Sequence, residues 1–171
     1  RMFARRYQII HQNLPLFRIE EYVPDRLLSD RDRIVIKTPS RLHLALIDMN
    51  GSCGRVDGGV GITLDNPGYI IEAEPAEETC VLGGDENLKN RVIGIITALS
   101  KQHGYDPGIS VRIHDTIPSH QGLGSGTQLS LAVATAMSRL SGVSATDQAR
   151  LTGRGGTSGI GGRSFTDGGV I

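Results

Sequence analysis

The sequence predicts an α+β fold, because segments with the alternating pattern of β-strands come first and segments with helical periodicity follow them. Its 171 residues are enough for one domain, or one domain and part of another, with a core that needs no disulfides. Most of the 23 glycines fall in three clusters, at residues 51–68, 122–126 and 153–169. Such clusters between well-patterned segments favour tight turns and close approach of the backbone to a ligand.

Residues 1–33 differ from the rest of the chain, since they hold seven of its arginines. Segments 7–10 and 16–23 are predicted to be strands on either side of a proline-containing turn. The polar run at 29–33 is expected to be a linker, because five consecutive polar residues cannot pack in a core. The predicted boundary therefore separates residues 1–33 from a domain at 34–171.

From Ile34 onward the alternation of apolar residues becomes regular and predicts a sheet. A glycine-rich turn at 50–61 interrupts it. The predicted strands are 34–36, 42–47, 62–64, 69–73, 79–82 and, after the first helix, 109–114.

Two helices are predicted together with their ends. Apolar residues repeat at helical spacing over Glu86–His103, Asp85 can cap the first turn, and Gly104 ends the helix. Residues 127–140 are small or apolar nearly all round, which indicates a deeply buried helix that ends at Gly142. The remaining predictions are a short helix at 145–151 and half of a β-hairpin at 165–171.

Charge and composition exclude several classes of protein. With 18 Lys+Arg against 18 Asp+Glu, the chain is not a generally basic nucleic-acid binder or a polybasic membrane-surface protein. The apolar run at 92–99 is too short for a membrane span. Cys53 and Cys80 have no metal-binding or disulfide spacing. We expect a cytoplasmic protein with small-molecule substrates and no membrane or nucleic-acid partner. The sequence does not determine the oligomeric state, and a homodimer is one assembly that it allows.

The loop that enters the second helix, PSHQGLGSGTQLS, has the strongest functional pattern. It turns on Gly122, Gly124 and Gly126 and then begins a buried helix. Unpaired backbone N–H groups at a helix start bind phosphate groups, and the glycines let the backbone wrap around an anion. Ser125 and Thr127 add hydroxyl groups that can donate to phosphate or reach its metal ion. The structural alternative is a serine-capped helix after a flexible loop.

This loop resembles the phosphate loop of the GHMP superfamily of small-molecule kinases, whose pattern is P-x-x-x-G-L-G-S-S/G. The segment TPSRLHLALIDMNG, which begins at Thr38, is similar to the first motif of that superfamily. The resemblance implies a GHMP-type N-terminal domain, which is an α+β domain of the ribosomal protein S5 domain 2-like type, cut before the C-terminal domain. The loop residues that fit the pattern are Pro118, Gly122, Leu123, Gly124, Ser125 and Gly126.

GHMP kinases place a catalytic aspartate in a run similar to S-G-x-D before a Gly-Gly pair. The corresponding run here is SGIGGRSFTDGG, in which Gly161 occupies the place of the aspartate. Glycine cannot deprotonate a hydroxyl group, so phosphoryl transfer by that route has no base. Asp167 lies six residues later in a sequence typical of a turn. An ATP-dependent GHMP kinase is one alternative interpretation of the sequence, and the missing base speaks against it. A non-enzymatic binding module with a degenerate phosphate site is another.

Four segments together resemble the β-ribofuranosylaminobenzene 5′-phosphate synthase family: TPSRLHLALIDMNG, GRVDGGVGITLDNP, IPSHQGLGSGTQLSLAVA and GRGGTSGIG. The resemblance covers residues 34–171 and implies a glycosyltransferase of the pentosyltransferase class. Such an enzyme condenses phosphoribosyl pyrophosphate with 4-aminobenzoate or 4-hydroxybenzoate and releases CO2 and pyrophosphate in tetrahydromethanopterin biosynthesis. The resemblance also implies Mg2+ as a cofactor and no use of ATP. Members of the family are longer, so we expect this sequence to lack the second half of the enzyme.

The reaction that the resemblance implies needs anion donors for pyrophosphate, for which the loop at 122–127 and the segment 154–157 are the candidates. It also needs carboxylates for Mg2+ and the sugar cation, and a cation for the benzoate, for which the candidates are Arg41 or Arg55. Asp48, Asp57 and His43 are the candidate catalytic residues, and the two aspartates are also the candidate metal ligands. His43 alternates with Arg41 along one strand, so both side chains share a face. Each residue has a structural alternative in a strand, a turn or the surface. The candidate substrate-binding residues are Arg41, Arg55, Gly122, Leu123, Gly124, Ser125, Gly126, Thr127, Arg154, Gly155, Gly156 and Thr157.

Residues 5–24 (RRYQIIHQNLPLFRIEEYVP) resemble the C-terminal end of the chorismate pyruvate-lyases. In that resemblance Glu20 falls on the active-site glutamate of the family. Because chorismate lyase produces 4-hydroxybenzoate, such a fusion would place the producer of the aromatic substrate beside its consumer. The alternative is an N-terminal β-hairpin that belongs to the main domain.

Overall fold

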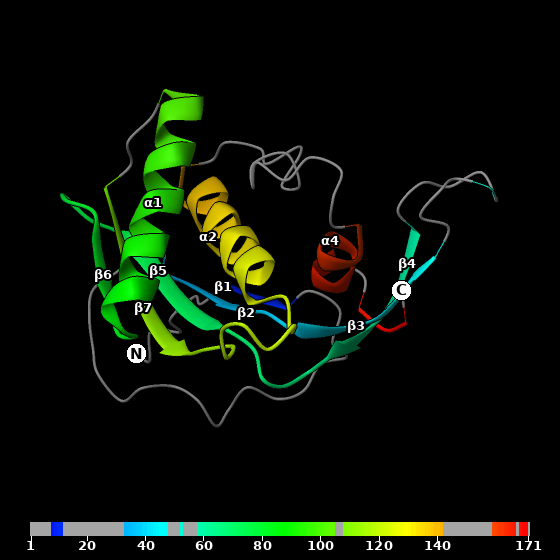
Figure 1. Ribbon diagram of the computed structural model, residues 1–171. Helices are drawn as coiled ribbons and strands as arrows, with labels where there is room; N and C mark the ends of the chain where they lie inside the picture. Colours follow the sequence, from blue (N-terminus) through cyan, green and yellow to red (C-terminus); the bar gives the residue numbers. More distant parts are fainter. Residues whose placement is uncertain are drawn as a thin grey trace, which may run out of the picture.

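A computed structural model shows two helices packed on one face of a five-stranded sheet (Figure 1). The strands of this sheet are β1 (Gln8–His11), β2 (Ile34–Lys37), β5 (Ile70–Pro75), β6 (Cys80–Leu82) and β7 (Ile109–Asp115). Their order is β1-β2-β5-β7-β6, in which each edge strand runs parallel to its neighbour and the central pairs are antiparallel. The structure describes residues 8–11, 33–47, 52, 58–104, 108–141, 159–166 and 168–170.

The hydrophobic core lies between this sheet and the helices α1 (Glu86–His103) and α2 (Ser125–Ser141). Alternate strand residues such as Ile36, Ile71 and Val111 are fully buried on the helical side of the sheet. Helix α2 lies between α1 and a further helix, α4, and it also contacts the sheet (Figure 1). Its small and apolar side chains are buried on nearly every side, which confirms the predicted burial of this helix.

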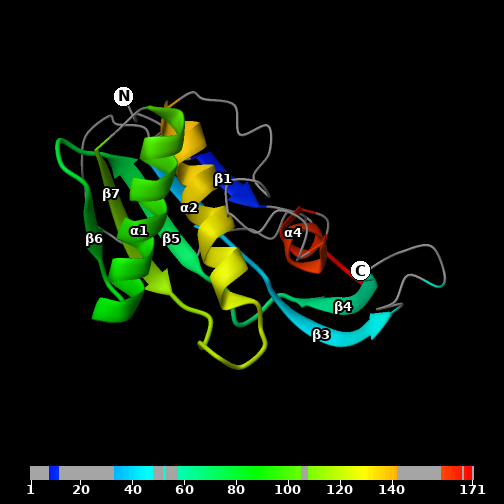
Figure 2. The same ribbon diagram turned by 45° about the horizontal axis from the view of Figure 1, so that its top comes forward.

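A separate two-stranded antiparallel sheet extends from the main layer and consists of β3 (Ser40–Ile47) and β4 (Gly58–Leu64) (Figure 2). Helix α4 (Gly159–Thr166) packs against it, and the Thr63 hydroxyl donates to Ser164 Oγ over 3.1 Å. The opposite side of this sheet exposes apolar side chains, among them Leu42 and Leu44 at 43% and 55%.

The ends of α1 form as the sequence predicts. The Asp85 carboxylate accepts a hydrogen bond from the Leu88 N–H over 2.7 Å and so satisfies a free donor of the first turn. Gly104 closes the helix at φ 63°, a left-handed conformation that side-chain-bearing residues rarely adopt.

Two predictions of secondary structure are wrong. Residues 58–61, expected in a turn, lie in β4, because their pairing with β3 continues through these glycines. Phe165, expected to begin a hairpin strand, lies fully buried in α4. Three glycines give this segment low intrinsic helix propensity, and packing against α2 and the β3–β4 sheet overrides that propensity. Val170 does pair with Ile62 in an isolated antiparallel bridge.

The face of the main sheet away from the helices is polar. Glu72, only 8% exposed, bonds Arg33 over 3.1 Å and the His114 ring over 2.9 Å. Arg33, the residue before β2, also reaches Glu74 over 3.3 Å, so these contacts connect the start of β2 to β5, and β5 to β7.

Several predictions lie outside the described residues: the strand at 16–23, Gly142, the helix at 145–151 and Cys53. The boundary at residue 33 stays a prediction, although β1 pairs with β2 within the same sheet. In the described part of the chain, no helix is both long and apolar enough to cross a membrane.

Candidate functional site

The loop before α2 is shaped by residues in left-handed backbone conformations. Gly122 and Gly124 each have φ 74°, and His120 has φ 61° although it carries a side chain. This conformation is inexpensive for glycine and costly for other residues, so the glycine spacing sets the path of the loop. The Gln128 N–H then donates to the Gly124 carbonyl over 3.1 Å and begins the helix.

A cavity of about 520 Å³ lies in front of the N-terminus of α2. The first N–H groups of a helix have no partner within the helix and carry partial positive charge, so they attract anions. The two arginines of the lining add to this field, and no acidic residue is among the described residues that line the cavity. The lining residues are Arg41, Asn87, Arg91, Ser119, His120, Gly122, Leu123, Gly124, Ser125, Gly126 and Thr127.

Arg41, from β3, forms one side of the cavity. Its backbone N–H donates to the Leu123 carbonyl over 3.1 Å and so joins the strand to the loop. Its side chain lies against Gly124, where an added Cβ would be only 2.9 Å from Arg41 Cγ and Nε. Gly124 is therefore needed for its backbone conformation and for the space that Arg41 occupies.

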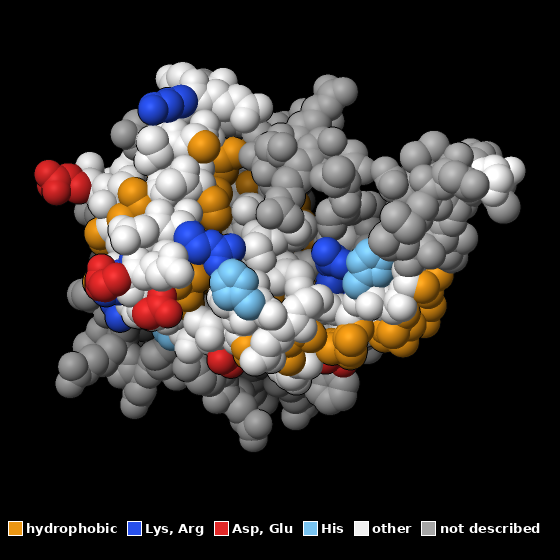
Figure 3. Space-filling view, in the orientation of Figure 1, with side chains coloured by type: hydrophobic (Ala, Val, Ile, Leu, Met, Phe, Trp, Pro, Cys, Tyr) orange, Lys and Arg blue, Asp and Glu red, His pale blue; other side chains and the backbone are white. Residues whose placement is uncertain are grey.

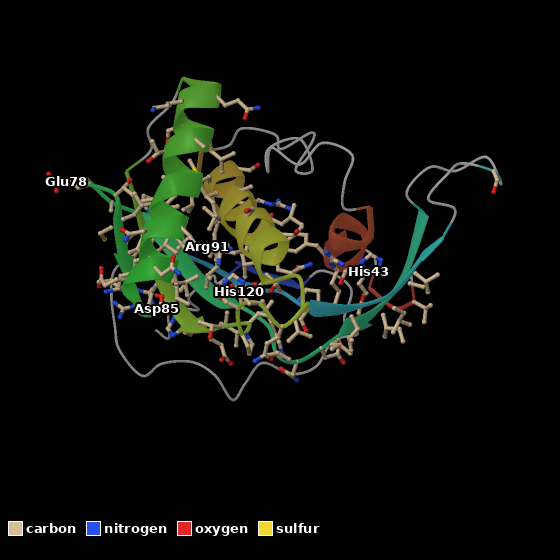
Figure 4. All side chains as sticks on the ribbon, viewed as in Figure 1. His43, Glu78, Asp85, Arg91 and His120 are labelled. Carbon is tan, nitrogen blue, oxygen red and sulfur yellow. The ribbon has the colours of Figure 1, made fainter. Side chains whose placement is uncertain are left out.

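Arg91, from α1, forms the opposite side. A Cβ added to Gly126 would lie 3.2 Å from Arg91 Nη2, so the guanidinium lies directly over the first turn of α2. Asn87 precedes Arg91 by one helical turn, on the same face of α1. Figure 4 shows Arg91 and His120 on the near side of the molecule around the start of α2, with His43 farther along on β3.

Near the middle of this face are two groups of basic side chains, each with a histidine beside an arginine or lysine, whereas the acidic side chains lie toward the left and lower margins (Figure 3). The distribution matches the cavity lining and favours a ligand with several negative charges.

Tyr69 is 1% exposed and forms a side-chain hydrogen bond with Ser125, which lines the cavity. Burial raises the pKa of its phenol above the ordinary value of 10.0, while Arg91 and the Ser125 hydrogen bond act in the opposite direction. The phenol therefore stays neutral at physiological pH and holds the Ser125 side chain beside the cavity.

Gly161, at the place of the kinase aspartate, is buried within α4 and does not line the cavity. Its carbonyl accepts a hydrogen bond from Gln128 Nε2 over 3.1 Å. Gln128 is itself completely buried, so this contact joins α4 to the second turn of α2.

The structure brings part of the predicted site together. Arg41 and the six loop residues at 122–127 line one cavity. His43 does not line it; its Nε2 lies 3.0 Å from the Ala45 carbonyl, at an irregularity in the pairing of β3. The register places His43 and Arg41 on the same side of β3, as alternation predicts. The predicted residues outside the described part are Glu20, Asp48, Arg55, Asp57, Arg154, Gly155, Gly156 and Thr157.

Sequence reasoning missed Asn87, Arg91 and Tyr69. The spacing of Asn87 and Arg91 by four residues shows that they share a face of the first helix, but not that this face meets the glycine loop. Among the described residues, no group of three acidic, histidine or cysteine side chains could hold a metal ion.

Comparison with known proteins identifies relatives of this chain. Residues 90–165 match the family model described as the GHMP kinases N terminal domain. The beta-ribofuranosylphenol 5'-phosphate synthase of Methanothermobacter thermautotrophicus is 43% identical over 147 residues, which are 81% of this chain and 45% of the relative. The enzyme of the same name from Archaeoglobus fulgidus is 44% identical over 138 residues, covering 80% of this chain and 43% of the relative. The chain thus spans less than half the length of both relatives.

Among solved structures, the mevalonate kinase of Methanococcus jannaschii matches with a TM-score of 0.53 and 16% identity over 71% of this chain and 45% of that one. At that identity the match shows the fold alone. The fold agrees with the predicted α+β domain of the GHMP type.

Proposed function

Because the chain contains a GHMP kinase N-terminal domain, we propose that the whole protein transfers a phosphoribosyl group from phosphoribosyl pyrophosphate to an aromatic carboxylic acid. The bond from C1 of the ribose to the diphosphate breaks, and the diphosphate leaves with the bonding electrons. The ring carbon that carries the carboxylate bonds to C1, and loss of CO2 restores the aromatic ring. Relatives at 43% and 44% identity that are named as synthases of a ribofuranosylphenol phosphate support this reaction.

The observation that carries the proposal is the basic cavity at the glycine loop. A leaving diphosphate gains negative charge in the transition state, and fixed N–H and guanidinium donors stabilise that charge most when water is excluded. Arg41 lies against this loop, so it is positioned for the diphosphate. Arg55 is then the candidate for the benzoate carboxylate.

We propose 4-hydroxybenzoate as the acceptor. The relatives' name specifies a phenol, which is what 4-hydroxybenzoate becomes when it loses its carboxylate. The alternative acceptor, 4-aminobenzoate, would give an aniline. We propose a place in tetrahydromethanopterin biosynthesis, which the relatives' name supports, and action in the cytoplasm.

The proposed cofactor is Mg2+, which usually binds one or two carboxylates together with substrate phosphate oxygens. The described part of the cavity fits the phosphate side of such a site, because Ser125 and Thr127 present hydroxyl groups there. We assign the carboxylates to Asp48 and Asp57. Bound Mg2+ would neutralise charge on the diphosphate as it leaves.

An ATP-dependent kinase on the same fold is the alternative. The buried backbone at Gly161 leaves no side chain at the place of the kinase base, which favours the synthase. The similarity of residues 5–24 to chorismate lyases supports a further proposal, that the protein also carries a lyase-like segment with Glu20 as its acidic residue.

The test is the fate of the carboxylate carbon. Full-length protein incubated with phosphoribosyl pyrophosphate, Mg2+ and 4-hydroxybenzoate labelled in the carboxylate should release labelled CO2. A phosphoribosylated product that retains the label would overturn the decarboxylating reaction.

A further inference from the structure

Arg91 is a basic residue of the cavity that neither the glycine-loop pattern nor the predicted site includes. It projects from α1 across to the first turn of α2, where its Nη2 lies against Gly126. A guanidinium in this position faces the same space as the free N–H groups of the helix start. An anion between them would contact both, since each donates hydrogen bonds and neither accepts them.

No described acidic residue forms an ion pair with Arg91, although Asp85, just before the first turn of α1, acts electrostatically on the same Tyr69 phenol as Arg91 does. The Lys and Arg ion pairs within the described part of the chain involve Arg33 and Lys89, and none involves Arg91. The cavity lining likewise contains basic and neutral residues but no described carboxylate. A partly buried arginine in such surroundings is stabilised by an anionic ligand, and the planar fork of the guanidinium matches phosphoryl oxygens.

The surroundings of Arg91 also fix where such a ligand would lie. Tyr69 lies close enough to Arg91 for the two to interact electrostatically, and it bonds to Ser125 at the start of α2. Arg91 and the Ser125 hydroxyl are thus held around one buried phenol. Asn87, one turn earlier on α1, adds an amide donor at the same side of the cavity.

We propose that Arg91 binds the leaving diphosphate opposite the N–H groups of α2, with Asn87 as a second donor. This inference rests on the proposed function, because it assigns one part of that substrate to one wall of the cavity. Arg41, from β3, and Arg91, from α1, then contact the diphosphate from opposite sides of the cavity. As the bond to C1 of the ribose breaks, charge moves onto the diphosphate, so Arg91 contributes to both binding and turnover.

The test uses inorganic pyrophosphate as the probe, titrated into the full-length protein by calorimetry. Arg91→Met should weaken pyrophosphate binding by about 10- to 100-fold, the effect expected for loss of a charge-assisted contact. Arg91→Lys keeps the charge but loses the planar fork, and it should bind with intermediate affinity. Arg112→Met is the matched control, since Arg112 is exposed on β7 and lies outside the cavity. It should bind as the wild type does.

Asn87→Asp provides a variant in which folding is not in question. An acidic residue in the first turn of a helix is favourable for the helix, whereas a carboxylate in the cavity repels pyrophosphate. We expect weaker pyrophosphate binding and an unchanged or higher melting temperature. Arg91→Met should also lower kcat/KM for phosphoribosyl pyrophosphate without lowering the melting temperature to a similar degree.

The outcomes separate this inference from the proposed function. Wild-type affinity for pyrophosphate in both Arg91→Met and Asn87→Asp would overturn the role of Arg91, even in a protein that is an active synthase. If the wild type releases no CO2 from 4-hydroxybenzoate but binds pyrophosphate in an Arg91-dependent way, the diphosphate subsite is supported while the proposed reaction fails.

Discussion

Gly124 and Gly126 lie two residues apart, the first in the loop and the second in the first turn of α2, and an added side chain is expected to have a different effect at each position. Gly124 has a left-handed backbone, and a Cβ there would meet the Arg41 side chain at 2.9 Å. Gly126 lies within α2, and a Cβ there would meet only the tip of Arg91, at 3.2 Å. The glycine spacing in the sequence indicates the loop, but this difference emerges only from the contacts.

Gly124→Ala should lower the free energy of unfolding by about 1–3 kcal/mol, because it combines backbone strain with displacement of Arg41. Pyrophosphate binding should weaken as well. The control is Gly126→Ala, which should be neutral or stabilising by up to about 1 kcal/mol through better helix propensity. Urea unfolding measures both values, and equal destabilisation by the two substitutions would contradict the assigned roles.

The raised pKa of the Tyr69 phenol predicts that the stability of the fold depends on pH. The pKa of the Tyr69 phenol is raised in the folded protein, so folding favours the neutral form. The resulting contribution to the free energy of unfolding is complete below the unfolded pKa of about 10, and it is lost as pH rises through the folded value. Tyr69→Phe lacks the contribution and also loses the hydrogen bond to Ser125.

The wild type should therefore exceed Tyr69→Phe in stability at neutral pH by about 0.5–1.5 kcal/mol, the usual net value of a hydrogen bond. The difference should shrink above about pH 10. Urea titrations at several pH values measure it, and a difference that stays constant up to the alkaline limit of folding would count against this account.

At the scale of elements, predictions from sequence succeed where a local pattern and its ends agree. Helix α1 has the predicted bounds, because apolar periodicity, the Asp85 cap and Gly104 all specify the same segment. Helix α4 was not predicted, since its glycines favour turns and only its packing against α2 and the β3–β4 sheet stabilises it. The loop of the candidate site follows from its glycines, whereas Arg91 enters the site through a contact between two helices that no local pattern encodes.

The Asp85 cap stabilises the start of α1, the helix that carries Arg91 and Asn87, through one hydrogen bond. Asp85→Ala should lower the free energy of unfolding by about 0.5–2 kcal/mol, because the Leu88 N–H loses its partner. Asp85→Asn, whose side chain can also accept this hydrogen bond, is the control and should lose much less. Thermal or urea unfolding distinguishes the two, and equal losses in both variants would mean that the hydrogen bond to the Leu88 N–H is not the source of the stabilisation.

At the scale of the whole molecule, balanced net charge coexists with a concentrated basic cavity. The 18 basic and 18 acidic residues cancel overall, but the described lining of the cavity has only basic and neutral side chains. Net charge argues against a general polyanion binder, which stays a prediction, but net charge cannot reveal a local site for a small polyanion. That site depends on the fold bringing β3, α1 and the start of α2 together.

The central claim is that this site serves a diphosphate leaving group and not the γ-phosphate of ATP. The most direct measurement follows pyrophosphate, CO2 and ADP together in one reaction of the full-length protein with phosphoribosyl pyrophosphate, 4-hydroxybenzoate, ATP and Mg2+. We predict that pyrophosphate and CO2 accumulate in equal amounts while ADP does not rise above the level without protein. Formation of ADP with transfer of phosphate to a small molecule, without release of CO2, would contradict the account and identify a kinase.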